Sequence, residues 1–381
     1  MTTKKNPYLD FYAEHNISPV ANNVNLDLHF IQRKALYHHL GITPKCIEER
    51  NILEFGPGNG INALFTISMN PDQYILVDAN PTGIKNCQKN LEHFFANKNW
   101  KVVDSLIDKF EINEKFDLVI CEGLLPNQIN PEQMAQYCGK FVKKGGLFTL
   151  TCHDMVSTLS ETLRCLPGML LIKNIDDFDE KVSILSDFYK PHLSHLKGMT
   201  RTNEEWVIDN ILNAEFWQDA PLFSIEEAID ALYDDFEVHL TSPSFHSDWT
   251  WYKSIEDVKV HFNSLMIENY WRYMHSFIDW RVTSPPRQEI ENKELSQLCR
   301  DIRTQVKNSL NDNSEINFLL ENCQKLSDYL PDENLVTRHS LKSYIDGLNE
   351  YLVKGRINPE KFSSFGAWWG RGMQYISFIK T

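Results

Sequence analysis

Short apolar runs alternate with amphipathic stretches through the first part of the chain. The apolar runs lie at residues 51–55, 73–77, 101–103, 115–121 and 147–151. Apolar side chains at helical spacing fill residues 61–68, 82–96 and 131–141. Strands that alternate with helices predict βαβ units, and the right-handed crossover of such units makes the strands parallel. We therefore expect a doubly wound α/β sheet.

The second half of the chain has a different pattern. A sixth strand is predicted at residues 236–240, and the alternating segment 367–381 predicts a last, antiparallel strand. Between them the spacing is helical, and the predicted helices lie at residues 254–280, 289–310, 316–329 and 339–353. The expected fold is a mostly parallel seven-stranded sheet with a helical lobe inserted before the last strand.

A glycine-rich turn follows the first predicted strand. The sequence reads LEFGPGNG, with Glu54 before the turn and glycine at positions 56, 58 and 60. Glycine adopts left-handed backbone conformations and has no Cβ, so a ligand can approach the backbone closely. A dinucleotide fingerprint is G-x-G-x-x-G, whereas the spacing here is G-x-G-x-G. This difference counts against NAD or FAD.

An acid, Asp78, ends the second predicted strand. It lies 22 residues after Gly56, close to the spacing expected for an acid that binds ribose hydroxyls. The sequence Asn80-Pro81 that follows also favours a turn, so the alternative is that Asp78 only caps the next helix. The glycine turn upstream favours the ligand role.

Taken together, the LEFGPGNG turn, the acid in LVDAN, the KFDLVIC strand and the later Lys-Gly-Gly turn resemble class I S-adenosylmethionine (SAM)-dependent methyltransferases over roughly residues 50–155. The resemblance implies SAM as the cofactor. It implies that the three glycines surround the methionine and ribose part of SAM. It also implies that Glu54 supports the turn and that Asp78 holds both ribose hydroxyls. It also implies that Asp104 contacts the adenine amino group; the alternative is a loop acid with no ligand.

The loop after the fourth predicted strand begins Glu122-Gly123. It lacks the Asn/Asp-Pro-Pro-aromatic run that the resemblance would require for methylation of nucleic-acid bases. Glu122 is a candidate polar contact to SAM or the acceptor, and Gly123 keeps the backbone close. The predicted cofactor-binding residues are thus Glu54, Gly56, Gly58, Gly60, Asp78, Asp104, Ser105, Glu122 and Gly123.

The fifth predicted strand ends in Cys152-His153-Asp154. A histidine beside an acid at the edge of the crevice can deprotonate a hydroxyl or an amine, since an unperturbed imidazole has a pKa near 6.5. His153 and Asp154 are therefore the predicted catalytic residues. The alternative is a structural histidine, because methyl transfer from a sulfonium often needs only alignment and desolvation.

Composition limits the partners. The chain has 381 residues, with 38 Lys and Arg against 52 Asp and Glu, so its net charge is −14. This charge repels phosphate backbones and disfavours a nucleic-acid substrate. The eight cysteines form no C-x-x-C pair, which predicts reduced thiols in a cytoplasmic protein. No apolar stretch approaches the length of a membrane span, so no membrane partner is expected.

Three further segments contain candidate functional residues. His192 and His195 have helical spacing but no third ligand at matching spacing, so no metal is predicted. The polar and aromatic run 201–217 is a candidate lid over the substrate, with a surface helix as the alternative. Tyr12 and His15 precede the sheet and either face the site or pack on the core.

The expected domains are N-terminal helices covering the cofactor site at 1–50, a SAM-binding domain at 51–250, the helical lobe at 251–366 and the returning strand at 367–381. The predicted function is in-line methyl transfer to an oxygen or nitrogen of a small-molecule acceptor, such as a metabolite or a sugar. Two alternatives remain: a non-catalytic module that binds SAM or a nucleoside, and an aminopropyltransferase of the same fold. Oligomeric state is left open.

Overall fold

The computed structural model describes residues 11, 25–126, 128–196, 199, 201–213 and 222–381. The predictions about Tyr12 and His15, and the 214–217 part of the candidate lid, lie outside the described residues. The chain divides into two compact units. The sheet unit comprises Met1–His153, Ala220–Tyr270 and Met373–Thr381, and the helical unit comprises Asp154–Asp219 and Trp271–Gly372.

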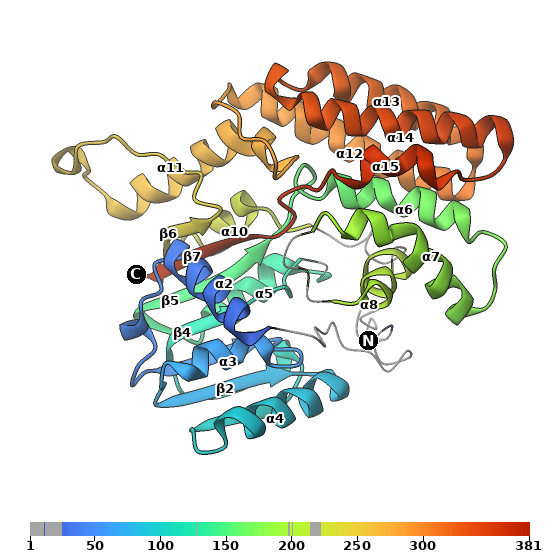
Figure 1. The fold of residues 1–381 in the computed structure, drawn as a ribbon. Helices are drawn as coiled ribbons and strands as arrows, with labels where there is room; N and C mark the ends of the chain where they lie inside the picture. Colours follow the sequence, from blue (N-terminus) through green and yellow to red (C-terminus); the bar gives the residue numbers. More distant parts are fainter. Residues whose placement is uncertain (1–10, 12–24, 127, 197–198, 200, 214–221) are drawn as a thin grey trace, which may run out of the picture. The chain divides into compact units, whose positions relative to one another are not determined.

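Seven strands form one sheet in the order β3-β2-β1-β4-β5-β7-β6 (Figure 1). The strands are β1 (Asn51–Phe55), β2 (Gln73–Asp78), β3 (Trp100–Asp104), β4 (Phe116–Cys121), β5 (Val142–Cys152), β6 (Phe236–Ser242) and β7 (Gln374–Lys380). β1 to β5 run parallel, whereas β7 runs antiparallel to both of its neighbours, β5 and β6. The predicted α/β sheet with an antiparallel last strand is confirmed.

Both faces of the central strands are buried, which explains their continuous apolar runs. The helices of the sheet unit are α2 (Leu26–His39), α3 (Ile61–Ser68), α4 (Pro81–Phe95), α5 (Pro131–Gly139), α10 (Ile225–Leu232) and α11 (Val258–Tyr273), which crosses into the helical unit. Ile52 packs into a buried cluster with α2, α3 and α4. Phe55 lies on the opposite face, where its ring is 5.7 Å from those of Phe110 and Phe141.

The carboxyl ends of the parallel strands meet at one edge of the sheet. Phe55 is in register with Val77 and with Cys121, and Asp78 is in register with Asp104. Helix α4 begins directly after β2, and its N-cap is Asn80, whose side chain accepts hydrogen bonds from two backbone N–H groups. The turns after β1 to β4 therefore come together at this edge.

The helical unit contains α6 (Leu159–Leu171), α7 (Phe178–Leu193), α8 (Asn203–Val207), α12 (Glu289–Asn311), α13 (Ile316–Tyr329), α14 (Leu335–Lys354) and α15 (Ser363–Gly366). Helix α12 packs against both α6 and α13. Residues 154–219, which the sequence pattern placed with the sheet, thus group with the later helices. This grouping depends on packing between residues far apart in the sequence, which local sequence patterns do not reveal.

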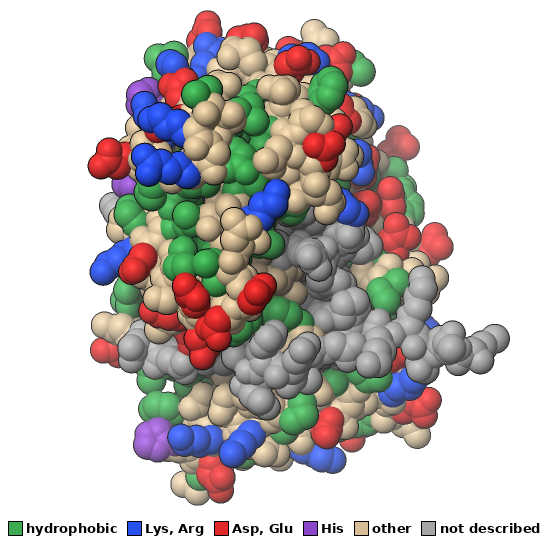
Figure 2. All heavy atoms as spheres, turned by 90° about the vertical axis from the view of Figure 1, so that its right-hand side faces the viewer, with side chains coloured by type: hydrophobic (Ala, Val, Ile, Leu, Met, Phe, Trp, Pro, Cys, Tyr) green, Lys and Arg blue, Asp and Glu red, His purple; other side chains and the backbone are tan. Residues whose placement is uncertain are grey.

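The face drawn in Figure 2 carries charged side chains of both signs among apolar and uncharged ones. On the face drawn in Figure 2, Lys and Arg lie among Asp and Glu and form no continuous basic stripe there. Within the described ranges, every helix is too short or too polar to cross a bilayer.

Candidate cofactor site

The glycine turn after β1 has the left-handed backbone that its sequence predicts. Gly56, Gly58 and Gly60 have φ angles of 69°, 57° and 78°. A Cβ at Gly60 would lie 2.7 Å from Cys87 Sγ, and a Cβ at Gly56 would lie 3.1 Å from Leu124 Cδ2. The turn therefore packs tightly against α4 and the loop after β4, and side chains at these positions would clash or strain the backbone.

Asp78 is part of this turn as well as of β2. Its Oδ2 accepts a hydrogen bond from Gly58 N at 3.0 Å, and its Oδ1 accepts one from Asn80 N at 2.8 Å. Burial raises the pKa of Asp78, these backbone N–H groups oppose the rise, and the Asp104 charge adds to it. The Ala79 N–H also hydrogen-bonds this carboxylate. A carboxylate has about four acceptor positions, so Asp78 can still accept from a ligand.

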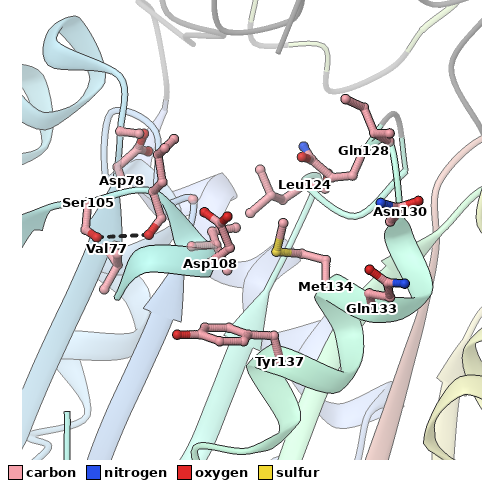
Figure 3. A pocket seen from close by; sticks show the side chains of 15 residues that line it. Val77, Asp78, Ser105, Asp108, Leu124, Gln128, Asn130, Gln133, Met134 and Tyr137 are labelled. Atoms are coloured by element: carbon pink, nitrogen blue, oxygen red, sulfur yellow. Dashed lines mark hydrogen bonds between the residues drawn. The ribbon is translucent and has the colours of Figure 1, made fainter. Parts of the chain in front are cut away.

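A cavity of about 400 Å³ opens beside Asp78 (Figure 3). Its volume is in the range of sites for small molecules. It is lined by Gly56, Val77, Asp78, Ala79, Ser105, Leu106, Ile107, Asp108, Leu124, Gln128, Ile129, Asn130, Gln133, Met134 and Tyr137. Three predicted cofactor residues, Gly56, Asp78 and Ser105, are among them. Ser105 N also donates to Asp78 O at 2.9 Å, which fixes the two loops to each other.

Several lining residues were missed by the sequence reasoning. Asp104 does not line the cavity, whereas Asp108, in the turn Ile107–Lys109, points into it (Figure 3). Both acids are exposed, and Asp108 Oδ2 lies 3.3 Å from Lys109 Nζ. Asn130, Gln133 and Tyr137 come from α5 and the residue before it. Their spacing of three and then four residues puts them on one helix face, and this spacing was the available signal.

Glu54 is buried below the turn rather than in the cavity. Its carboxylate accepts a hydrogen bond from the Tyr74 hydroxyl on β2. Burial raises the pKa of Glu54 to about 7, and the nearby Glu122 charge adds to the rise. Glu54 thus connects β1 to β2 as a group that titrates near neutral pH.

Glu122 follows β4 and pairs with Arg33 of α2. Arg33 Nη1 is 2.7 Å from Glu122 Oε2, and Arg33 Nη2 is 2.9 Å from Glu122 Oε1. Both side chains are buried, with 7% and 6% of their surface exposed. Gly123, next in the loop, has a φ of 67°, and its N–H donates to Thr151 Oγ1 at 2.8 Å. Arg33 was not among the predicted residues.

His153 and Asp154 adjoin the end of β5, outside the cavity lining. His153 N donates to Phe223 O at 2.8 Å, and burial lowers the pKa of the His153 ring to about 4. Its Nδ1 is buried without a hydrogen-bond partner among the residues described. Asp154 Oδ1 accepts from the N–H groups of Val156 and Ser157, both at 2.8 Å, so this oxygen orders the turn before α6.

His192 lies in the core of the helical unit. Its ring packs against Phe188 and Phe365, and burial followed by the Arg164 charge lowers its pKa to about 3. Within the described part of the chain, no group of three or more His, Cys, Asp or Glu side chains is placed to hold a metal ion.

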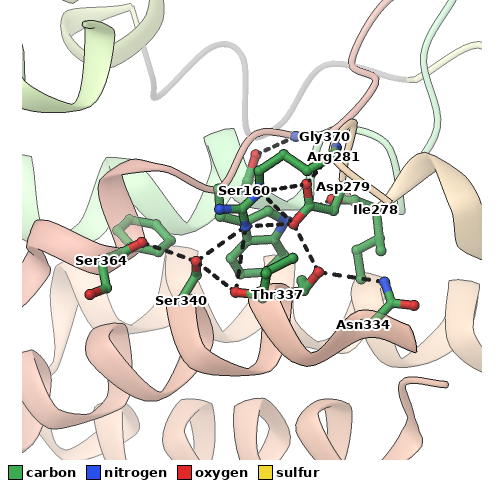
Figure 4. Close-up of polar contacts among 12 residues, drawn as sticks. Ser160, Ile278, Asp279, Arg281, Asn334, Thr337, Ser340, Ser364 and Gly370 are labelled. Carbon is green, nitrogen blue, oxygen red and sulfur yellow. Dashed lines mark hydrogen bonds and ion pairs between the residues drawn. The ribbon is translucent and has the colours of Figure 1, made fainter. Parts of the chain in front are cut away.

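A second polar cluster also lies in the helical unit (Figure 4). Buried Asp279 accepts hydrogen bonds from Arg281 Nη2 at 2.6 Å and from Thr337 Oγ1 at 2.8 Å. Arg281 Nη2 is also 3.2 Å from Ser340 Oγ. These partners tie the segment before α12 to α14, so the cluster has a structural role.

Residues 48–209 match a protein family described as "Methyltransferase domain". A comparison with curated proteins found no match. Among solved structures, the magnesium protoporphyrin IX methyltransferase of Synechocystis PCC 6803 with bound S-adenosylhomocysteine (SAH) is 13% identical, with a TM-score of 0.36, and the match covers 56% of this chain and 75% of that one. The CcbJ methyltransferase of Streptomyces caelestis is 14% identical, with a TM-score of 0.29, and covers 33% and 50% respectively.

PKMT2 from Rickettsia typhi is 15% identical, with a TM-score of 0.39, and the match covers 62% of this chain and 49% of that one. The chain spans about half the length of the first solved structures it matches. Scores of this size carry no argument about the substrate. The family match, together with the glycine turn and the acid that ends β2, identifies residues 48–209 as a class I methyltransferase domain whose cofactor is SAM.

Proposed function

We propose that the protein transfers the methyl group of SAM to an oxygen or a nitrogen of a small-molecule acceptor. The observation that carries the proposal is the cavity of about 400 Å³ that joins the glycine turn to Asp78 inside the methyltransferase domain. SAM supplies an activated methyl group on a sulfonium, which the acceptor attacks in line. The protein's part is to bind, align and exclude water.

The cavity residues suit the adenosine part of SAM. The Asp78 carboxylate keeps acceptor capacity beside the cavity, which suits hydrogen bonds from ribose hydroxyls. Val77, Leu106, Leu124 and Met134 supply apolar lining for a purine ring.

The net charge and the sequence of the loop after β4 both favour a small-molecule acceptor. A net charge of −14 repels nucleic acids, which favours a metabolite or a sugar. We also place the protein in the cytoplasm, because the eight cysteines, all of them described, form no disulfide and seven of them are buried.

The test is calorimetry with SAH, followed by a screen of small hydroxyl and amine compounds for SAH release from SAM. We expect SAH binding and at least one acceptor that turns over. Tight SAH binding without turnover would instead favour the non-catalytic module. Turnover only with decarboxylated SAM and a polyamine would favour the aminopropyltransferase. Absence of SAH binding would overturn the proposal.

Asp108 is predicted to contribute more to cofactor affinity than Asp104. Asp108 points into the cavity, where its carboxylate can accept a hydrogen bond from the adenine amino group (Figure 3). Asp108→Asn should weaken SAH binding by about 10-fold, the effect of losing one charge-assisted hydrogen bond. Asp104→Asn is the matched control and should change affinity by less than about 2-fold. If calorimetry instead shows the larger loss of SAH affinity in Asp104→Asn, Asp104 makes the adenine contact.

His153 is proposed as the general base, and its burial sets the expected pH profile. With a pKa of about 4, the ring is neutral and able to accept a proton at pH 7. Turnover should therefore be maximal above that pKa and fall as the pH drops through it. His153→Gln should lower kcat by about 100-fold without changing the SAH affinity.

The control for this variant is His93→Gln on α4, which is exposed and outside the cavity lining. If His153→Gln turns over at the wild-type rate, alignment alone accounts for the methyl transfer.

A further inference from the structure

Helix α2 precedes the matched domain but contributes a buried cation at the sheet edge. Arg33 binds both carboxylate oxygens of Glu122, at 2.7 and 2.9 Å, across 89 residues of sequence. Such a bidentate ion pair fixes the orientation of the two side chains as well as the distance between them. Burying two charges is costly unless further hydrogen bonds complete the site.

Neighbouring side chains supply those hydrogen bonds. Arg33 Nη2 donates to the Tyr37 hydroxyl at 3.3 Å, and that hydroxyl shares a 2.7 Å hydrogen bond with Thr66 Oγ1 on α3. Asn62, in the first turn of α3, donates to Glu122 Oε2 at 3.5 Å. Burial alone would lower the pKa of Arg33, but the Glu122 carboxylate raises it well above its ordinary value. Arg33 is thus held charged between α2, α3 and the loop after β4.

Two side-chain nitrogens on α2 nevertheless lack a partner within the described residues. Arg33 Nε and His29 Nε2 are buried without a hydrogen-bond partner among the described residues. His29 lies one turn before Arg33, and its ring makes a hydrogen bond to the backbone of Ile61, the first residue of α3. Burial followed by the Arg33 charge lowers the pKa of His29, so the ring is neutral near pH 7. Buried polar atoms are nearly always paired in folded proteins. These two therefore point to a polar ligand group near the N-terminus of α3.

The order of the strands suggests which ligand group this is. β1 lies between β2, which ends in Asp78, and β4, which is followed by Glu122. The glycine turn after β1 separates the two acids. SAM carries adenine on one side of its ribose and an amino acid on the other. If the ribose is held at Asp78 and the adenine fills the cavity, only the amino-acid end is left to cross this turn.

We propose that Arg33 is a positioning residue of the cofactor site. It holds Glu122 so that the two side chains present a fixed pair of opposite charges to the zwitterionic amino-acid end of the cofactor. With the cofactor bound, Glu122 would hold its ammonium group, and Arg33 with the N-terminus of α3 would hold its carboxylate. This inference rests on the proposed function and extends the site to a helix outside residues 48–209.

The test compares two ligands by calorimetry: SAH, and 5′-methylthioadenosine, which lacks the amino-acid end. Arg33→Met should weaken SAH binding by about 10- to 100-fold and change 5′-methylthioadenosine binding by less than about 3-fold. Arg33→Lys keeps the charge but loses the two-pronged geometry, and should restore part of the SAH affinity. Lys34→Met, at an exposed neighbouring position on α2, is the control and should bind both ligands as the wild type does.

Because removing one member of a buried pair destabilises a protein, the double variant Arg33→Met/Glu122→Gln is included. It leaves no unpaired charge, so it should stay folded while losing the preference for SAH. Equal weakening of both ligands, or no change in either, would overturn the inference while leaving SAM as the cofactor. Failure of the wild type to bind either ligand would instead contradict the proposed function, and this inference with it.

Discussion

Asp78→Asn should weaken SAH binding by about 100-fold or more. The substitution removes the charge that would accept hydrogen bonds from two ribose hydroxyls, and each charge-assisted hydrogen bond contributes about 1.5–3 kcal/mol. It also leaves one side-chain acceptor for Gly58 N and Asn80 N, which both donate to the carboxylate. The glycine turn should therefore loosen, and calorimetry with SAH measures the combined loss.

The control is Asp72→Asn, an exposed acid just before β2, at the opposite end of that strand from Asp78. It makes the same change of charge far from the turn, and its affinity for SAH should equal that of the wild type. Wild-type affinity in Asp78→Asn would mean that the acid only supports the turn, and it would remove the main argument for the adenosine site.

The second large effect concerns the pH dependence of stability. Glu54 has a folded-state pKa of about 7, because burial and then the Glu122 charge disfavour its ionised form. The unfolded chain releases this proton near pH 4.3. Between these values the folded state binds more protons than the unfolded state, so the free energy of unfolding falls as pH rises through the window.

Glu54→Gln removes this dependence while keeping an acceptor for the Tyr74 hydroxyl. From pH 5 to pH 8 the wild type should lose about 2 to 3 kcal/mol more stability than the variant, as measured by urea unfolding. Glu92→Gln, on the exposed side of α4, should follow the wild type. Parallel profiles for wild type and Glu54→Gln would mean that Glu54 is ionised throughout the range.

Local patterns predicted the sheet well because parallel strands that are buried on both faces consist of continuous runs of apolar residues. The glycine turn was equally visible, since positive φ at Gly56, Gly58 and Gly60 strongly favours that residue type. The acid at the end of β2 followed from a fixed spacing. These features depend on a few neighbouring residues, which is why sequence reasoning reached them.

The remainder of the site depends on contacts that have no local signature. In the sequence, Arg33 cannot be distinguished from any other basic residue of an amphipathic helix. Only the fold brings it to Glu122, 89 residues away. Asp108 enters the cavity because a short turn follows β3 and redirects the chain after Asp104. Asp154 was paired with His153 by adjacency alone, whereas one of its oxygens orders the backbone of the next turn.

The position of β7 bears on how the chain is synthesised. This strand lies between β5 and β6 in the sheet. It is formed by residues 374–380, which follow the whole helical unit in the sequence. While a ribosome is still making the segments before it, β5 and β6 lack their shared partner and present open backbone edges. Such edges invite pairing with other chains. The interval before β7 emerges is therefore the stage of biosynthesis at which chaperone protection matters most.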